Sequence, residues 1–119
     1  MATFLLLFSG GGMPQSEAET KKVMDAWTAW MGKHKDAITD PGNPFTPVAK
    51  TITKEGKVTD GPVGEPASGY TVIKADSLDK AIEIAKGCPV FLGGAKISLY
   101  ETFDAMAMAE QGARGASRN

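Results

Sequence analysis

The sequence contains one cysteine, Cys88, and one histidine, His34, which excludes two common kinds of site. A single cysteine cannot form a disulfide within the chain. Structural zinc sites are built from cysteine and histidine, so a zinc site here would have to consist almost wholly of carboxylates, which is rare. We therefore expect no metal and no other cofactor. A lone cysteine also fits a reducing compartment.

A strong net charge and long apolar runs are missing as well. Lysine and arginine number 13 against 14 aspartate and glutamate, so a net charge of -1 gives no reason to expect nucleic acid or an anionic membrane as partner. The apolar run at residues 4–8 follows no positive region and is too short for a signal peptide. Nothing approaches the ~18 apolar residues of a membrane span. These features predict a cytoplasmic protein.

The chain has 119 residues, of which 42% are apolar, and this is the size and composition of one globular domain. We assign residues 1–111 to that domain. Residues 112–119 have the composition of a flexible C-terminal tail.

Hydrophobic periodicity and turn residues predict an order of strands and helices. Residues 4–8 form a continuous apolar run, which is typical of a strand buried on both faces. The order as a whole is βαββαβ with an extra hairpin, and it predicts an α+β, ferredoxin-like antiparallel sheet with two helices on one face. The other predicted elements are a helix from Ser16 to His34, strands at 48–53, 58–59, 70–75 and 96–101, a helix from Ser77 to Gly87, and a short helix at 103–111.

Both main helices carry start signals and an apolar stripe. Ser16 and Glu19 form a capping box, and Asp76-Ser77 caps the second helix. The predicted apolar stripes are Val23, Trp27, Trp30 and Met31 in the first helix and Leu78, Ala81, Ile82 and Ala85 in the second.

The strand at residues 4–8 indicates that one copy of the chain is not enough. Right-handed crossovers place both helices on the same face of the sheet. Side chains alternate along a strand, so an apolar run also presents apolar groups to the uncovered face. A few hundred Å² of exposed apolar surface marks an interface. A homodimer with the two sheets face to face is the simplest solution, and the alternative is that the C-terminal segment folds back as a cover.

The uncovered face should also carry polar groups. Tyr70 alternates with Thr71 in one strand, and Tyr100 and Ser98 alternate with Leu99 in another. Tyrosine and serine among apolar neighbours suit a partly polar ligand cavity between two sheets. They are equally compatible with ordinary side chains at a sheet edge.

Several short segments in the part of the chain from Trp27 to Glu101 follow a known order and spacing. They are Val58-Thr59-Asp60-Gly61-Pro62, Gly69-Tyr70, Ala75-Asp76-Ser77-Leu78-Asp79-Lys80-Ala81, Cys88-Pro89 and Gly93-Gly94. In these segments the chain resembles the YCII-related family, also called the DGPF domain family. The resemblance implies a dimeric α+β barrel and, for most members, no established biochemical function. Some members of the wider group are proposed to use a His–Asp pair in acid–base chemistry.

The chain departs from that family at several points. Val63 stands where the family has phenylalanine, and residues 64–67 replace an acidic and lysine-bearing stretch. The last strand lacks the usual acidic residue followed by arginine. The family's histidine lies earlier in the first helix, where this chain has none. Only Asp60 corresponds directly.

Asp60 and His34 are the candidate catalytic pair. A carboxylate beside an imidazole orients it and raises its basicity, so that the pair can take a proton near neutral pH. The alternative is that Asp60 stabilises the Gly61-Pro62 turn while His34 complements the helix dipole beside Lys33.

The remaining candidates each have a structural alternative. Trp27 and Trp30 could line a ligand pocket with Tyr70 and Tyr100, although a tryptophan pair on a helix face is more often core. The glycine-rich turn at residues 9–12 precedes a helix N-terminus, yet it lacks the lysine of a P-loop. Cys88 follows a helix C-terminus and is not expected to be reactive.

Three functions remain open from the sequence. The first is a small homodimeric module that binds a small molecule in the cavity between the sheets. The second is a cofactor-free acid–base enzyme, of the proton-transfer or elimination kind, that uses Asp60. The third is a structural or regulatory interaction domain without a ligand.

Overall fold

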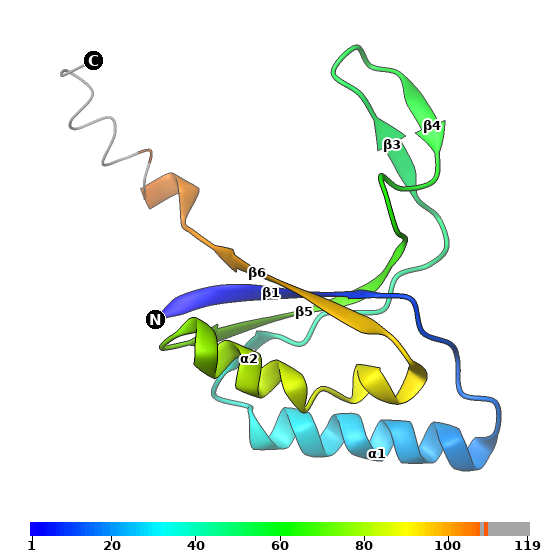
Figure 1. The fold of residues 1–119 in the computed structure, drawn as a ribbon, viewed down its shortest axis with the longest axis vertical. Coiled ribbons are helices and arrows are strands. Elements are labelled where there is room, and N and C mark those ends of the chain that lie inside the picture. The colour runs from blue at the N-terminus through cyan, green and yellow to red at the C-terminus, as the bar shows by residue number, and fades with distance from the viewer. Residues whose placement is uncertain (108, 110–119) are drawn as a thin grey trace.

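The computed structural model describes residues 1–107 and 109 and contains a four-stranded antiparallel sheet with helices on one face (Figure 1). The strand order is β2-β5-β1-β6. This arrangement confirms the predicted α+β, ferredoxin-like architecture. The sheet strands are β1 (Ala2–Ser9), β2 (Ile38–Asp40), β5 (Ala67–Ala75) and β6 (Lys96–Thr102), and the helices are α1 (Glu17–Lys33), α2 (Leu78–Lys86) and the 3-10 helix η1 (Pro89–Gly93).

The central strand β1 presents apolar side chains to both faces, as its sequence predicted. Phe4, Leu6 and Phe8 are buried beneath the helices. Leu5 and Leu7 lie on the opposite face and are only half-buried. We call this opposite side the open face; its central residues are Leu5, Leu7, Tyr70, Val72 and Tyr100.

Helix α1 begins and ends where its capping residues predict. The Ser16 side chain accepts a hydrogen bond from the Glu19 backbone N–H at 3.1 Å. The helix ends at His34, whose backbone N–H donates to the Trp30 carbonyl. Trp30 is buried in the core, and Trp27, Met31 and Val23 are half-buried along the same helix. The predicted stripe of α1 is therefore the face that it buries.

Helix α2 approaches the sheet through small residues. Ala81 and Ala85 are buried, and Ile84 packs against the core beside them. The predicted stripe is wrong at Leu78 and Ile82, which are 50% and 38% exposed. The short alanine side chains allow the helix to lie close to the sheet, so the larger residues flanking that contact point outward.

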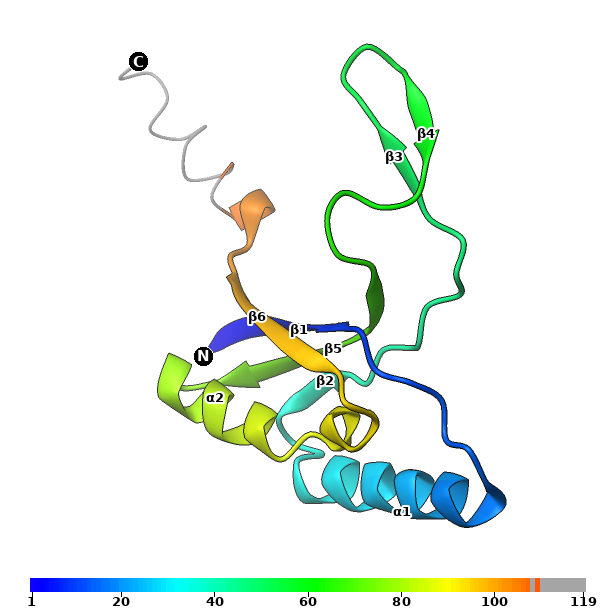
Figure 2. The same ribbon diagram turned by 45° about the vertical axis from the view of Figure 1, so that its right-hand side comes forward.

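The sheet differs from the sequence prediction in its edge strand. Ile38–Asp40, which no pattern in the sequence indicated, forms β2 and pairs with β5. The predicted strands at 48–53 and 58–59 form a hairpin, as expected, of β3 (Lys50–Ile52) and β4 (Val58–Asp60), and this hairpin is not part of the four-stranded sheet. Figures 1 and 2 show this hairpin rising from the side of the sheet that faces away from the helices.

The C-terminal region is described only in part. A helical turn covers residues 105–107, within the helix expected at 103–111. The expected tail at 112–119 lies outside the described residues. In the part of the chain that the structure covers, no helix has both the length and the apolar character needed to cross a membrane.

Candidate functional site

Trp27 of α1 and Val90 of η1 contribute to two cavities beside the helices. The larger cavity lies toward the N-terminal end of α1, and we call it the loop cavity after the β1–α1 connection. The smaller cavity lies toward the segment between β2 and the hairpin, and we call it the aromatic cavity.

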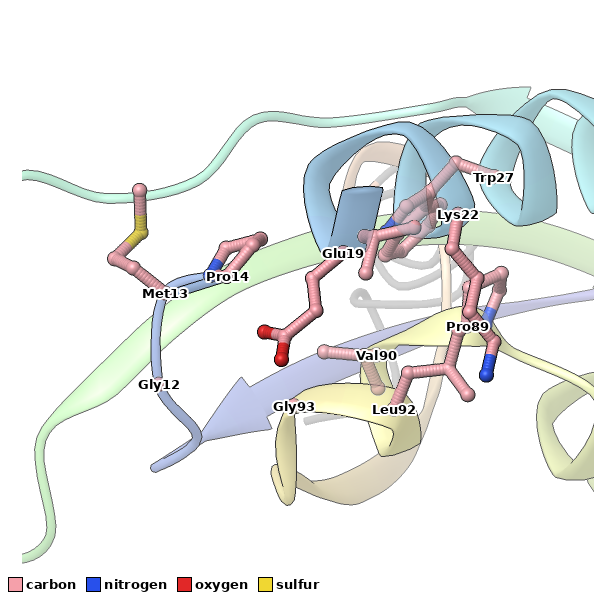
Figure 3. Close-up of a pocket in the computed structure, with 11 residues that line it drawn as sticks. Gly12, Met13, Pro14, Glu19, Lys22, Trp27, Pro89, Val90, Leu92 and Gly93 are labelled. Carbon is pink, nitrogen blue, oxygen red and sulfur yellow. The ribbon is translucent and has the colours of Figure 1, made fainter. Parts of the chain in front are cut away.

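The loop cavity has a volume of about 490 Å³ and lies between the β1–α1 connection and η1 (Figure 3). Met13 and Pro14 form one wall, and Val90 and Leu92 of η1 form another. Glu19 extends into this space, but its carboxylate already accepts a hydrogen bond from the Gln15 backbone N–H at 2.8 Å. The carboxylate of Glu19 therefore has a role in starting the helix.

The aromatic cavity has a volume of about 350 Å³ and a mostly apolar lining. None of the described lining residues is charged. Asn43 and Ser68 supply polar groups at one end. Its larger apolar and aromatic lining residues are Phe8, Met24, Trp27, Met31 and Tyr70. Apolar walls with a few polar groups are typical of sites for small molecules.

Gly42 allows the loop after β2 to close one end of the aromatic cavity. Its φ of +72° is in the left-handed region, and a Cβ there would lie 1.8 Å from the Tyr70 carbonyl oxygen. Asp40 fixes this turn by accepting a hydrogen bond from the Gly42 N–H at 2.8 Å. The Thr71 hydroxyl donates to the Pro41 carbonyl at 2.9 Å, and Phe45 stacks on Tyr70 with ring centroids 5.8 Å apart. The loop is thus tied to β5 at several points.

The two tryptophans, predicted together as ligand residues, occupy different environments. Trp30 is buried, its indole N–H donates to the Ile84 carbonyl at 3.1 Å, and it lines neither cavity. Trp27 lies edge-on to Trp30 and against Phe8, with part of its surface free. Of the two tryptophans, Trp27 is therefore the one that can contact a ligand in these cavities.

The structure does not bring Asp60 and His34 together within one chain. Asp60 ends β4 on the hairpin, where its side chain is 91% exposed and pairs with Lys50. His34 lies at the end of α1, on the other side of the sheet, with its ring against Trp30 at 5.8 Å (Figures 1 and 2). Burial, with a smaller contribution from the charge of Lys33, lowers the pKa of His34 below 6.5.

Tyr70 and Tyr100 share the open face, as strand alternation predicted. Tyr70 pairs with Leu7, and Tyr100 pairs with Leu5. The Tyr70 hydroxyl donates to an Asp40 carboxylate oxygen at 3.4 Å, and Tyr70 also contributes to the lining of the aromatic cavity. Tyr100 is 55% exposed and lines neither cavity. Of the predicted ligand residues, the structure therefore brings Tyr70 and Trp27 to one cavity.

Thiol chemistry and metal binding find no support in the described residues. Cys88 is buried, and this burial raises the pKa of its thiol to about 11 despite a hydrogen bond from the Val90 backbone. A thiol with this pKa is not a nucleophile at neutral pH. No group of three or more histidine, cysteine or acidic side chains gathers anywhere in residues 1–107.

Sequence reasoning missed several residues of the aromatic cavity. Met31 and Phe8 were predicted as core because their spacing fits a buried face, and no sequence signal separates a core residue from a cavity wall. Met24 lies outside the predicted stripe of the helix and was not singled out. The loop at 41–44 carried a usable signal, since its prolines and glycine require an irregular path beside the sheet.

Comparison with solved structures shows that this fold is a known one. The chain matches 5-chloro-2-hydroxyhydroquinone dehydrochlorinase (TftG) from Burkholderia phenoliruptrix AC1100, in a complex with 2,5-dihydroxybenzoquinone, at a TM-score of 0.51 and 17% identity. The match covers 85% of this chain and 93% of that one. A second match, to At3g17210 from Arabidopsis thaliana, has a TM-score of 0.46 and 10% identity, and covers 87% and 95% of the two chains.

The sheet topology and the match to the dehydrochlorinase define the protein as an α+β chain with a ferredoxin-like sheet. At 17% identity, the likeness concerns the fold alone. No family model matches the sequence, and no curated protein does. The resemblance to the YCII-related family stays a prediction from the short segments between Trp27 and Glu101.

Proposed function

We propose that the protein is a small homodimeric module that binds a small, flat and largely apolar molecule in the aromatic cavity. The observation that carries this proposal is the cavity itself, with Phe8, Trp27 and Tyr70 among its lining residues. Its volume of about 350 Å³ is at the small end of ligand pockets, which run from roughly 300 to 1,000 Å³. A molecule with a single ring fits this size, and 2,5-dihydroxybenzoquinone in the dehydrochlorinase complex is such a molecule.

Binding is favoured over catalysis because the described lining of the aromatic cavity has no histidine or carboxylate, the side chains that most often act as a general base. A general base must come within about 2.6–3.2 Å of the proton it removes, or reach it through one water. Within residues 1–107, no histidine or carboxylate side chain reaches the lining of this cavity. Asp60 is not among the lining residues of the aromatic cavity. The alternative of acid–base chemistry at Asp60 would therefore require the hairpin of a second copy to place this residue beside the bound molecule.

The open face supports the homodimer. Both α-helices lie on the other side of the sheet (Figure 2). Leu5, Leu7 and Val72 remain half-buried at the centre of the open face, and Tyr100 is 55% exposed beside them. Apolar side chains at the centre of a sheet are stabilised by burial at about 25 cal/mol per Å² of apolar surface. A second copy presents the same apolar surface, and a two-fold axis lets the two faces cover each other.

The binding proposal predicts a specific response of Trp27. We expect 2,5-dihydroxybenzoquinone or p-cresol, added to nitrogen-15-labelled protein, to shift the indole N–H resonance of Trp27 and the backbone resonances of Gly42 and Gly69. Trp27→Leu should weaken binding about tenfold, which is ~1.4 kcal/mol, because it removes an aromatic wall. The measurement is an NMR titration.

The matched control is Phe91→Leu. Phe91 belongs to η1 beside Val90, yet it lines neither cavity, so its replacement should leave the affinity unchanged. Shifts centred on Tyr100 and Leu5 would instead place the ligand between the two sheets. An absence of saturable shifts with both probes would contradict a single-ring ligand.

A further inference from the structure

The β3–β4 hairpin extends away from the rest of the chain with little to support it. Within the described residues, its two strands form a sheet of their own, through the pairs Lys50↔Asp60, Thr51↔Thr59 and Ile52↔Val58. Figures 1 and 2 show that it rises on the side of the open face. An isolated two-stranded hairpin is marginally stable at best in water. A hairpin of this kind needs a surface to lie against.

The two faces of the hairpin differ in chemistry. Directly paired residues point to the same face, and successive residues alternate. Ile52 and Val58 therefore lie side by side on one face, where they are 71% and 57% exposed. We call this the arm face, and the Lys50–Asp60 ion pair lies next along it. The opposite face carries Thr51 and Thr59 and is polar.

The open face of the sheet is small for an interface between two copies. With strands ~4.8 Å apart and a rise of ~3.3 Å per residue, a four-stranded face about seven residues long covers roughly 450 Å² in plan. A stable protein–protein interface buries about 800 Å² on each partner. Further surface must come from elements on the same side of the sheet. The hairpin is such an element, and its apolar residues are exposed.

We propose that the hairpin is an intersubunit arm, whose arm face lies against a second copy of this chain. This inference rests on the homodimer of the proposed function. Because a two-fold axis repeats every contact, each copy contributes one arm, and the two arms flank the paired sheets. Ile52 and Val58 are buried against the partner in this arrangement. The arm also carries Asp60 out of its own chain and into the interface.

A pair of neighbouring substitutions tests the arm. Val58→Asp places a charge on the arm face, and Thr59→Asp places the same charge on the opposite face one residue away. We expect Val58→Asp to raise the dissociation constant of the dimer at least tenfold, and Thr59→Asp to change it less than twofold. Sedimentation equilibrium measures the constant, and circular dichroism checks that each variant remains folded.

The possible outcomes distinguish a failure of the arm proposal from a failure of the dimer proposal. A wild-type chain that stays monomeric at all concentrations contradicts the proposed dimer and the arm with it. A wild-type dimer that tolerates Val58→Asp contradicts the arm alone. Equal weakening by both substitutions also contradicts it, because the effect would then not depend on the arm face.

A second measurement does not depend on disrupting the interface. A nitroxide label on Ile52→Cys reports local mobility, and the buried Cys88 does not compete for the label. We expect an immobilised spectrum in the dimer and a mobile one after dilution below the dissociation constant. A label that is mobile in a demonstrated dimer overturns the proposal.

Discussion

At the residue scale, the environment of each side chain decides between the roles that the sequence left open. Trp30 and Trp27 are three positions apart on one helix, yet one is buried with its indole hydrogen-bonded and the other borders both cavities. The protonation of His34 also depends on its environment. Burial of its ring, which packs against Trp30, and the positive charge of Lys33 both disfavour the imidazolium form.

The lowered pKa of His34 predicts a pH dependence of stability with a definite sign. Between its folded pKa and the unfolded value of about 6.5, the folded state binds fewer protons at His34 than the unfolded state does. The contribution of His34 is therefore fully present above pH 6.5 and is lost as the pH falls below it. As the chain has one histidine, a proton NMR titration gives its pKa directly.

Urea denaturation at pH 7.5 and 5.5 measures the consequence. His34→Gln should reduce the difference in unfolding free energy between these two pH values. The carboxylates contribute equally to the pH dependence of the wild-type protein and the variant, so they do not affect this comparison. A measured pKa at or above 6.5 would contradict the assignment.

At the element scale, local signals placed most helix ends and strands, and they failed where tertiary contacts decide. Ser16 and Ser77 cap α1 and α2 as predicted, because capping depends on residues within one turn. β2 escaped prediction because its three residues carry no periodicity and form a strand only through pairing with β5. The exposed residues of the predicted α2 stripe were not foreseen, because an apolar stripe does not specify how closely a helix approaches a sheet.

The loop at the aromatic cavity gives a prediction at this scale. Gly42→Ala should destabilise the fold by more than the roughly 1–3 kcal/mol of a strained left-handed backbone, because its Cβ would also meet the Tyr70 carbonyl. Gly10→Ala is the matched control: its φ is +73°, and nothing lies within 4 Å of its Cβ position. Urea denaturation of both variants checks the difference. Equal destabilisation would show that the loop moves away from β5 at little cost.

At the scale of the whole molecule, the described residues cover the sheet on one side only. Phe4, Leu6 and Phe8 are buried under the helices, while Leu5 and Leu7 face away from them. The contrast within one strand supports a second copy as the cover. The arm and the open face would then belong to a single interface.

Leu7→Asp should separate the dimer into folded monomers. A two-fold axis introduces the charge twice at the centre of the interface, so we expect the dissociation constant to rise at least about a hundredfold, which is ~2.7 kcal/mol. Ile82→Asp on α2 is the control, as it makes the same kind of change at a position 38% exposed away from the open face. Light scattering over a range of concentrations distinguishes the states. A Leu7→Asp variant that remains dimeric would place the interface elsewhere.

The sequence by itself determined the helix caps, the three longer strands of the sheet and the two apolar faces of β1, because these depend on alternation and on neighbours within one turn. Only the tertiary structure decided which apolar residues line a cavity and which are core, since Trp27 and Trp30 have the same chemistry and differ in what packs on them. It also decided that Asp60 lies far from His34. A residue on a hairpin follows the direction of that hairpin, and no local pattern encodes that direction.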